Sequence, residues 1–132
     1  MVRRVRIGGR RSKYNVRRDP TKRTVDGIVF ASQAEARRYE VLKLRQRAGV
    51  IGNLSLQPRF ILQEPFTCRG KKINGIRYTA DFRYTEDGET VIEEVKGRET
   101  RDFELRKKMF LKLYGDRYRY KQVPSDDVLT HP

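Results

Sequence analysis

The stretch from Tyr78 to Lys96 constrains the fold more than any other part of the sequence. Apolar and polar residues alternate from Thr79 to Tyr84, which is the period of a β-strand. Asp87-Gly88 then predicts a hairpin turn, because glycine tolerates the positive φ that such turns require. The β-branched stretch Thr90 to Lys96 predicts the second strand. One face of the first strand is predicted to carry three residues: Ala80, Phe82 and Tyr84.

Charged residues interrupt the second of these strands. Alternation places Glu94 and Lys96 on one face and Glu93 on the other, and pairing brings Asp81 of the first strand beside Glu94. Burying charge is costly unless the charge is paired or binds a metal. Asp81, Glu94 and Lys96 therefore form a candidate Mg²⁺ site with an attached lysine. The alternative is a set of cross-strand salt bridges on a solvated face, where each pair contributes only about 0.2 to 1 kcal/mol.

Length and composition bound the remaining possibilities. The chain has 132 residues, enough for one domain, and a formal net charge of +14, which favours nucleic acid first and an anionic membrane second. No apolar run reaches transmembrane length and no signal-peptide core follows the N-terminus, so we expect a cytoplasmic protein without a membrane partner. Cys68 is the single cysteine and His131 the single histidine. Disulfides and classical Ser-His-Asp or Cys-His catalysis are therefore disfavoured, which leaves carboxylates, lysine and metal.

The remaining elements follow from periodicity and from helix-ending signals. Alternation and turn residues predict a hairpin over Thr24 to Phe30 and a strand over Leu54 to Gln63, with Pro58 at an edge or bulge. A polar connection follows from Glu64 to Gly75. Two helices and a last strand complete the prediction: Ser32 to Ala48, ended by Gly49; Arg101 to Tyr114, capped by Thr100 and ended by Gly115; and Arg117 to Val123, stopped by Pro124.

Apolar stripes are predicted on both helices. The first helix is expected to bury five residues: Ala36, Tyr39, Val41, Leu42 and Leu44. The second is expected to bury four: Phe103, Phe110, Leu111 and Tyr114.

Glu35 has two interpretations. Ser32 and Glu35 fit a capping box, in which serine caps the helix and glutamate bonds back to the cap amide. Alternatively, Glu35 is a third acidic residue of the candidate site.

Basic residues cluster in three places. Residues 1 to 24 hold ten Lys or Arg and one acid, which predicts a flexible arm that binds phosphates; the polar connection and the second helix add further cations. The alternative in each case is an ordinary solvated surface. The candidate DNA-binding residues are Arg10, Arg11, Lys13, Arg17, Arg18, Lys71, Lys72, Arg106, Lys107 and Lys108.

Asp81, followed by Glu94-Val95-Lys96, resembles the D…(D/E)xK signature of the PD-(D/E)XK nuclease superfamily. The predicted order of helix, three strands, helix and strand is similar to the αβββαβ core of that superfamily, and the resemblance covers roughly residues 31 to 123. Two departures stand out: a long segment, with an additional strand, separates Glu35 from Asp81, and Ala80 precedes Asp81 where the superfamily's name has proline. The resemblance is nearest to small phage-encoded members and to archaeal-type Holliday junction resolvases.

This resemblance implies a restriction-endonuclease-like α/β fold with a mixed central sheet flanked by helices. It also implies a homodimeric, Mg²⁺-dependent endonuclease that cuts four-way DNA junctions, with Mn²⁺ able to substitute, in a bacterial or archaeal host cell. Glu35, Asp81, Glu94 and Lys96 are the implied catalytic residues. Asp81, Glu94 and the Val95 carbonyl are the implied metal ligands.

The expected organisation is a basic arm over residues 1–24, a nuclease-like domain over 25–123 and a polar tail over 124–132. Other functions remain open at this point. A nuclease of the same superfamily could act on duplex, flap or DNA ends instead, and a non-catalytic nucleic-acid-binding module could share the fold. A basic ribosome- or RNA-associated protein would fit the charge but gives no reason for acids on central strands.

Overall fold

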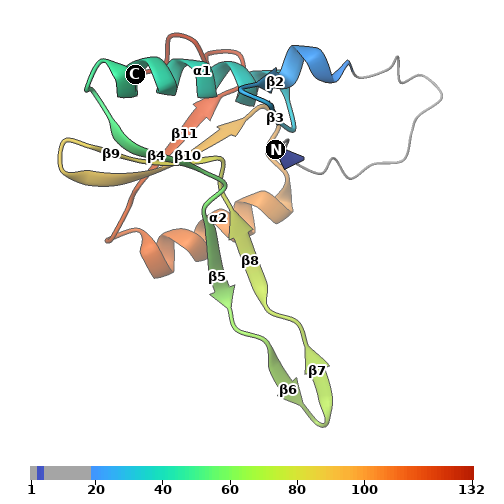
Figure 1. The fold of residues 1–132 in the computed structure, drawn as a ribbon. Coiled ribbons are helices and arrows are strands. Elements are labelled where there is room, and N and C mark those ends of the chain that lie inside the picture. Colours follow the sequence, from blue (N-terminus) through green and yellow to red (C-terminus); the bar gives the residue numbers. More distant parts are fainter. Residues whose placement is uncertain (1–2, 5–18) are drawn as a thin grey trace.

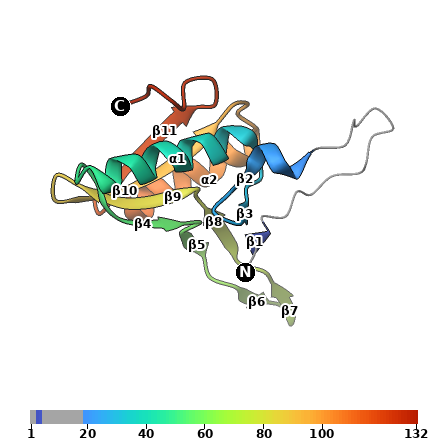
Figure 2. The same cartoon turned by 45° about the horizontal axis from the view of Figure 1, so that its top comes forward.

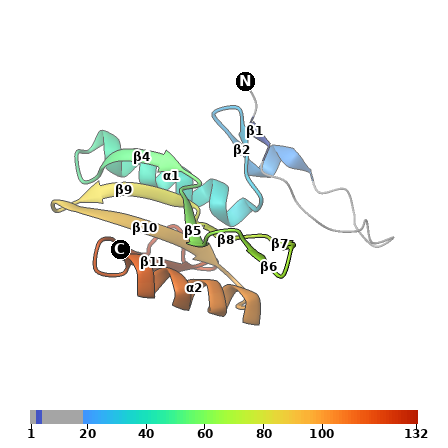
Figure 3. The same ribbon diagram turned by 90° about the horizontal axis from the view of Figure 1, so that it is seen from below.

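A four-stranded mixed sheet lies between two helices in the computed structural model, which describes residues 3–4 and 19–132 (Figures 1 and 3). The strand order is β11-β10-β9-β4; β10 and β11 are parallel, and the other two pairs are antiparallel. The bounds are β4 Gly52–Leu56, β9 Phe82–Glu86, β10 Glu89–Lys96, β11 Arg119–Pro124, α1 Gln33–Arg47 and α2 Arg101–Tyr114. The α/β class predicted from the sequence is confirmed.

The predicted hairpin is present as β9 and β10. Asp87 and Gly88 form its turn with φ of 51° and 78°, in the left-handed region that glycine and aspartate tolerate.

The prediction that Ala80, Phe82 and Tyr84 share one face of the first strand is wrong for Ala80. Phe82 and Tyr84 pack beneath α1, whereas Ala80 belongs to the cluster on the α2 side. The reason is a bend at Ala80–Asp81, where the chain leaves one sheet and enters the other.

Helix α1 begins and ends as predicted. Ser32 is its N-cap, and the Ser32 hydroxyl oxygen accepts the Glu35 N–H at 3.1 Å. Ala36, Tyr39 and Leu42 are buried against Phe82, Tyr84, Val91 and Val95 of the sheet. Leu44, expected in the apolar stripe, is 61% exposed, and Arg38 is fully buried instead. The buried face of α1 therefore includes a cation, because Arg38 forms an ion pair with Glu93 of the sheet.

Helix α2 covers the other face of the sheet. Thr100 accepts the Phe103 N–H at 3.1 Å, and Gly115 ends the helix, as predicted. Phe103 and Phe110 are buried with Ile92 in the second cluster. Leu111, expected in the stripe, is 41% exposed because it lies on the side of the helix that turns away from the sheet.

The segment predicted as one strand over Leu54 to Gln63 is two strands. Gln57 has φ of 51°, and the chain turns at Gln57-Pro58 out of β4 into β5 Arg59–Gln63. Strand β5 pairs with β8 Ile76–Thr79, outside the central sheet. The polar connection between them forms a second hairpin of β6 Phe66–Cys68 and β7 Lys71–Ile73. Residues 59–79, called the arm below, project away from the core (Figure 1).

The ends of the predicted domains are also structured. A 3-10 helix, Pro20–Arg23, precedes the predicted hairpin of β2 Thr24–Val25 and β3 Ile28–Val29 (Figure 2). Residues from Pro20 onward therefore do not belong to the flexible N-terminal segment that was predicted over residues 1–24. Strand β1 Arg3–Arg4 pairs in parallel with β3. The expected polar tail is packed on the core, since Val128 is 5% exposed and belongs to the cluster beneath α1. None of the helices in the described residues is long and apolar enough to cross a membrane.

Candidate active site

The candidate site lies where the arm joins the central sheet. Three backbone hydrogen bonds fix this junction: Gln57 N–H donates to the Asp81 carbonyl at 2.9 Å, Ala80 N–H to the Pro58 carbonyl at 3.0 Å, and Asp81 N–H to the Glu93 carbonyl at 3.1 Å. The backbone of Asp81 is therefore held from both sides, between β4 and β10. Such a position places a side chain more accurately than a free loop would.

The Asp81 carboxylate turns toward β10. Its Oδ2 accepts the Val95 N–H at 2.8 Å. Burial, with the nearby charges of Glu94 and Glu35, raises the pKa of Asp81 well above its usual value of 3.8. The Val95 amide and Lys96 oppose this shift. The predicted pairing of Asp81 with Glu94 is consistent with the observed register, in which Phe82 lies opposite Glu93.

Glu94 is 8% exposed and faces the α2 side of the sheet with Ile92. The Tyr78 hydroxyl donates to Glu94 Oε2 at 3.1 Å, and a second hydroxyl, that of Tyr120, lies 3.1 Å from the Tyr78 hydroxyl. Burial raises the pKa of Glu94 to about 7, with the Glu35 charge adding to the shift while Tyr78 and Lys96 oppose it. Neither tyrosine was among the predicted site residues; their alternation on strands next to Glu94 was the available signal.

Glu35 is linked both to the N-cap of α1 and to the other acids. Its Oε1 accepts the Ser32 hydroxyl at 3.3 Å, so the reciprocal bond goes to the cap side chain rather than to the cap amide. Burial nevertheless raises the pKa of Glu35, and its charge raises the pKa of both Asp81 and Glu94. Glu35 thus caps α1 and belongs electrostatically to the same group of acids.

Lys96 is the cation of this group. It is half-buried at the end of β10, and its Nζ lies 4.3 Å from the centre of the Phe103 ring. Its charge lowers the pKa of Glu35, Asp81 and Glu94. One ammonium therefore acts on all three predicted acids, and all four predicted catalytic residues lie in one region.

A small pocket opens beside the acids. Glu35, Gln57 and Asp81 provide its polar lining, and the apolar lining consists of Ile28, Phe30, Leu56 and Phe82. The bend at Gln57-Pro58 places Gln57 on this pocket.

Hard oxygen donors are the ligands that the site offers. Mg²⁺ keeps several waters and needs only one or two carboxylates, which Asp81 and Glu94 supply. Their raised pKa values reflect burial and the charges of neighbouring acids, and a bound cation would favour the ionised carboxylates. In residues 3–4 and 19–132, no group of three or more His, Cys, Asp or Glu is arranged to hold a metal. Asp81, Glu94 and the Val95 carbonyl stay predicted ligands, with water completing the coordination.

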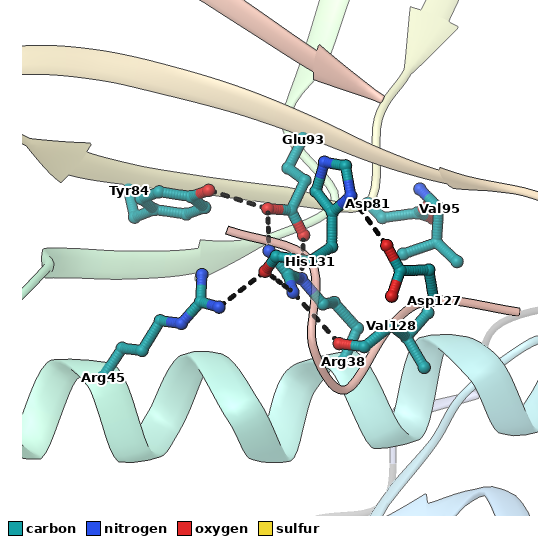
Figure 4. A network of polar contacts seen from close by, with 9 residues as sticks. All are labelled: Arg38, Arg45, Asp81, Tyr84, Glu93, Val95, Asp127, Val128 and His131. Atoms are coloured by element: carbon teal, nitrogen blue, oxygen red, sulfur yellow. Dashed lines mark hydrogen bonds and ion pairs between the residues drawn. The ribbon is translucent and has the colours of Figure 1, made fainter. Parts of the chain in front are cut away.

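Glu93, on the opposite face of β10, has a separate role that the sequence did not indicate. Arg38 donates to Glu93 Oε2 at 2.8 Å and Oε1 at 3.0 Å, and the Tyr84 hydroxyl donates to Glu93 at 2.7 Å (Figure 4). Arg38 also donates to the Val128 and His131 carbonyls, each at 3.0 Å. This network joins α1, the sheet and the C-terminal segment. A lone arginine on an apolar helix face was the available signal.

The candidate DNA-binding residues have different surroundings. Lys71 and Lys72 are exposed near the arm's turn, and Lys108 is exposed on α2. Two others on α2 have partners within the chain: Arg106 bonds Asp102 and the Arg77 carbonyl, and Lys107 bonds Gln122 at 2.8 Å. Five lie outside the described residues: Arg10, Arg11, Lys13, Arg17 and Arg18.

Stability is expected to depend on pH through Glu94. The folded pKa is about 7 against an ordinary 4.5, so between these values the folded protein binds more protons than the unfolded chain. In EDTA, the free energy of unfolding should therefore fall as pH rises from 4.5 to 7, by about 3 kcal/mol from this residue. Urea unfolding of the wild type and of Glu94→Gln at several pH values measures how steeply the free energy of unfolding falls with pH in each protein. Equal slopes for the two proteins would contradict the expectation.

Comparison with known proteins places the chain in a family without assigning an activity. No curated protein and no solved structure matches the chain. A single family model matches residues 11–126, which include the whole central sheet, both helices, the arm and all four predicted catalytic residues. The chain therefore belongs to the family described as "Protein of unknown function (DUF1064)".

Proposed function

We propose that this protein is a Mg²⁺-dependent DNA endonuclease of the PD-(D/E)XK type, with four-way junctions as its preferred substrate. The observation that carries the proposal is the group of Asp81 and Glu94, two buried or half-buried acids with raised pKa values, beside Lys96. Natural proteins retain such unfavourable charges mainly at functional sites. The D…ExK spacing gives the group a chemical interpretation.

The order of elements supports the proposal. Omitting the arm, the chain runs α1, β4, β9, β10, α2 and β11, which is the αβββαβ order expected for this superfamily. The long segment between Glu35 and Asp81, noted as a departure in the sequence, contains the arm between β4 and β9. The departure is therefore an insertion between core strands, and the core order is unaffected.

Each residue has a proposed role in phosphodiester hydrolysis. Asp81 and Glu94 hold the metal, which when bound polarises the phosphate and lowers the pKa of a coordinated water. Lys96 orients the attacking water and neutralises charge that develops on the phosphate. Glu35 positions a water on the pocket side of Asp81. Val95 keeps the Asp81 carboxylate in place through its amide.

The net charge of +14 supports a polyanionic substrate. A four-way junction has approximate two-fold symmetry, so cutting two opposed strands suits a homodimer with two sites. Branched DNA and a homodimer are therefore the proposed partners.

The test is a cleavage panel with labelled DNA. Wild type and Glu94→Gln are incubated with a four-way junction, a flap and a matched linear duplex, each with Mg²⁺, Mn²⁺ or EDTA. Glu89→Gln is the matched control, because Glu89 is an exposed acid on the same strand. We expect symmetric, metal-dependent cuts in the junction, lost in Glu94→Gln and retained in Glu89→Gln.

Other results would change the assignment. Equal cleavage of the linear duplex or flap would keep the nuclease and remove the junction preference. Tight DNA binding without cleavage of any substrate in either metal would overturn the catalytic proposal and favour a binding module.

A further inference from the structure

The outer half of the arm is exposed to solvent. From Gln63 to Asn74 every residue is exposed, and the hairpin of β6 and β7 pairs only with itself (Figure 1). Arg69 and Gly70 form its turn, both with positive φ. An isolated two-stranded hairpin is marginally stable in water, so an exposed one suggests a partner that completes it.

The root of the arm, in contrast, is fixed to the core. Phe60 and Tyr78 are buried against Phe110 of α2, with ring centroids 4.8 Å and 5.4 Å from it. The Tyr114 hydroxyl donates to the Ile61 carbonyl at 2.9 Å. The arm therefore projects in a fixed direction from its base.

That base is the candidate site itself. Strand β8 ends at Thr79, two residues before Asp81, and β5 begins two residues after Gln57, which lines the pocket. A strand rises about 3.3 Å per residue, so Lys72 lies at most about 30 Å from Asp81 along the chain. That reach is close to one turn of duplex DNA, roughly 34 Å.

The chemistry of the arm favours a polyanion. It carries five basic residues and one acid, Glu64; the basic residues are Arg59, Arg69, Lys71, Lys72 and Arg77. Three of them surround the turn. An apolar pair accompanies them, since Phe66 lies opposite Ile73 and the two are 47% and 39% exposed. A two-stranded β-ribbon fits the major groove, where basic side chains reach phosphates and apolar ones reach thymine methyl groups.

We propose that the arm binds the duplex that flanks the cleaved bond, within about one helical turn of Asp81. Arg69, Lys71 and Lys72 contact phosphates, and Phe66 with Ile73 lies in the groove. The site would then act best on DNA in which about one helical turn of duplex lies on one side of the cleaved bond. This inference rests on the proposed function for the position of the cut, but binding by the arm does not require cleavage.

The test measures binding in the Asp81→Asn background, so that the DNA stays intact. The arm variant is Arg69→Ala/Lys71→Ala/Lys72→Ala. Its matched control, Lys22→Ala/Arg37→Ala/Arg47→Ala, removes the same charge from exposed positions on the 3-10 helix and α1. Fluorescence anisotropy gives Kd for junctions and linear duplexes with flanks of 20 or 5 base pairs, at several salt concentrations. Thermal melting checks that each variant is folded.

We expect the arm variant to bind the long-flanked DNA roughly 10- to 100-fold more weakly, with a salt slope smaller by about 3, because each phosphate contact contributes about 0.9. On short-flanked DNA it should bind like the parent protein. Phe66→Ser, a second variant, should weaken binding to long flanks several-fold without changing the salt slope.

Three results would overturn the inference: no change in the arm variant, an equal change in the control, or an equal loss on both flank lengths. Self-association that disappears in the arm variant while DNA binding persists would make the arm a protein interface instead. The same experiments distinguish failure of the proposed nuclease activity from failure of DNA binding by the arm. A wild type that cuts nothing, with an arm variant that loses long-flank binding, keeps the arm inference and removes the catalytic one.

Discussion

Replacing Asp81 by asparagine is expected to reduce metal-dependent DNA cleavage at least about 100-fold while leaving the fold intact. Asparagine keeps an oxygen that can accept the Val95 N–H, the one side-chain hydrogen bond that Asp81 makes in the described structure. It removes the charge that would hold the metal. Because burial and two neighbouring acids raise the pKa of Asp81, losing that charge should also leave the melting temperature unchanged or higher at pH 8.

Cleavage rates and thermal melting of the same preparations measure both effects. Asp87→Asn is the matched control: it makes the same chemical change six residues away, in the exposed hairpin turn, where asparagine tolerates the φ of 51°. The control should cleave like wild type. Full activity in Asp81→Asn would remove Asp81 from the site. A large loss of melting temperature would mean that the residue is structural.

Replacing Arg38 by alanine is expected to have the largest effect on stability, a loss of about 3–5 kcal/mol. The substitution leaves Glu93 fully buried without its cation and removes the donor to the Val128 and His131 carbonyls. Such a loss is a large part of the roughly 5–15 kcal/mol that holds a domain folded. Urea unfolding of Arg38→Ala beside Arg37→Ala, an exposed neighbour on α1, measures it.

A double variant tests the cause. Arg38→Met/Glu93→Gln removes both charges and keeps an oxygen for the Tyr84 hydroxyl. It should recover most of the stability that Arg38→Ala loses, because the main penalty is an unpaired buried charge. If the double variant is as unstable as the single one, packing of the arginine side chain would be the dominant contribution. A loss below about 1 kcal/mol in Arg38→Ala would contradict the expectation altogether.

The strand predicted over Leu54 to Gln63 is divided into β4 and β5, because the chain turns into the arm at Gln57-Pro58. Leu54 to Gln63 has the alternation of one strand, and nothing in its composition marks a change of sheet. The break at Gln57-Pro58 is stabilised by hydrogen bonds to Asp81 and Ala80, residues more than twenty positions later. Local pattern carries no information about such a long-range partner. The separate bend at Ala80–Asp81, bonded to that break, places Ala80 on the opposite side of the sheet from Phe82.

The hairpin of β9 and β10, the ends of both helices and the face on which Glu94 lies could be predicted from the amino-acid sequence alone. These features follow from local rules, namely turn residues, caps and alternation. Three contacts become visible only in the folded chain: Glu35 lies in the same charged group as Asp81, Tyr78 bonds Glu94, and Arg38 is buried on Glu93. Each of these contacts joins elements far apart in the chain. Their energies depend on burial and on the direction of a side chain, which a one-dimensional pattern does not contain.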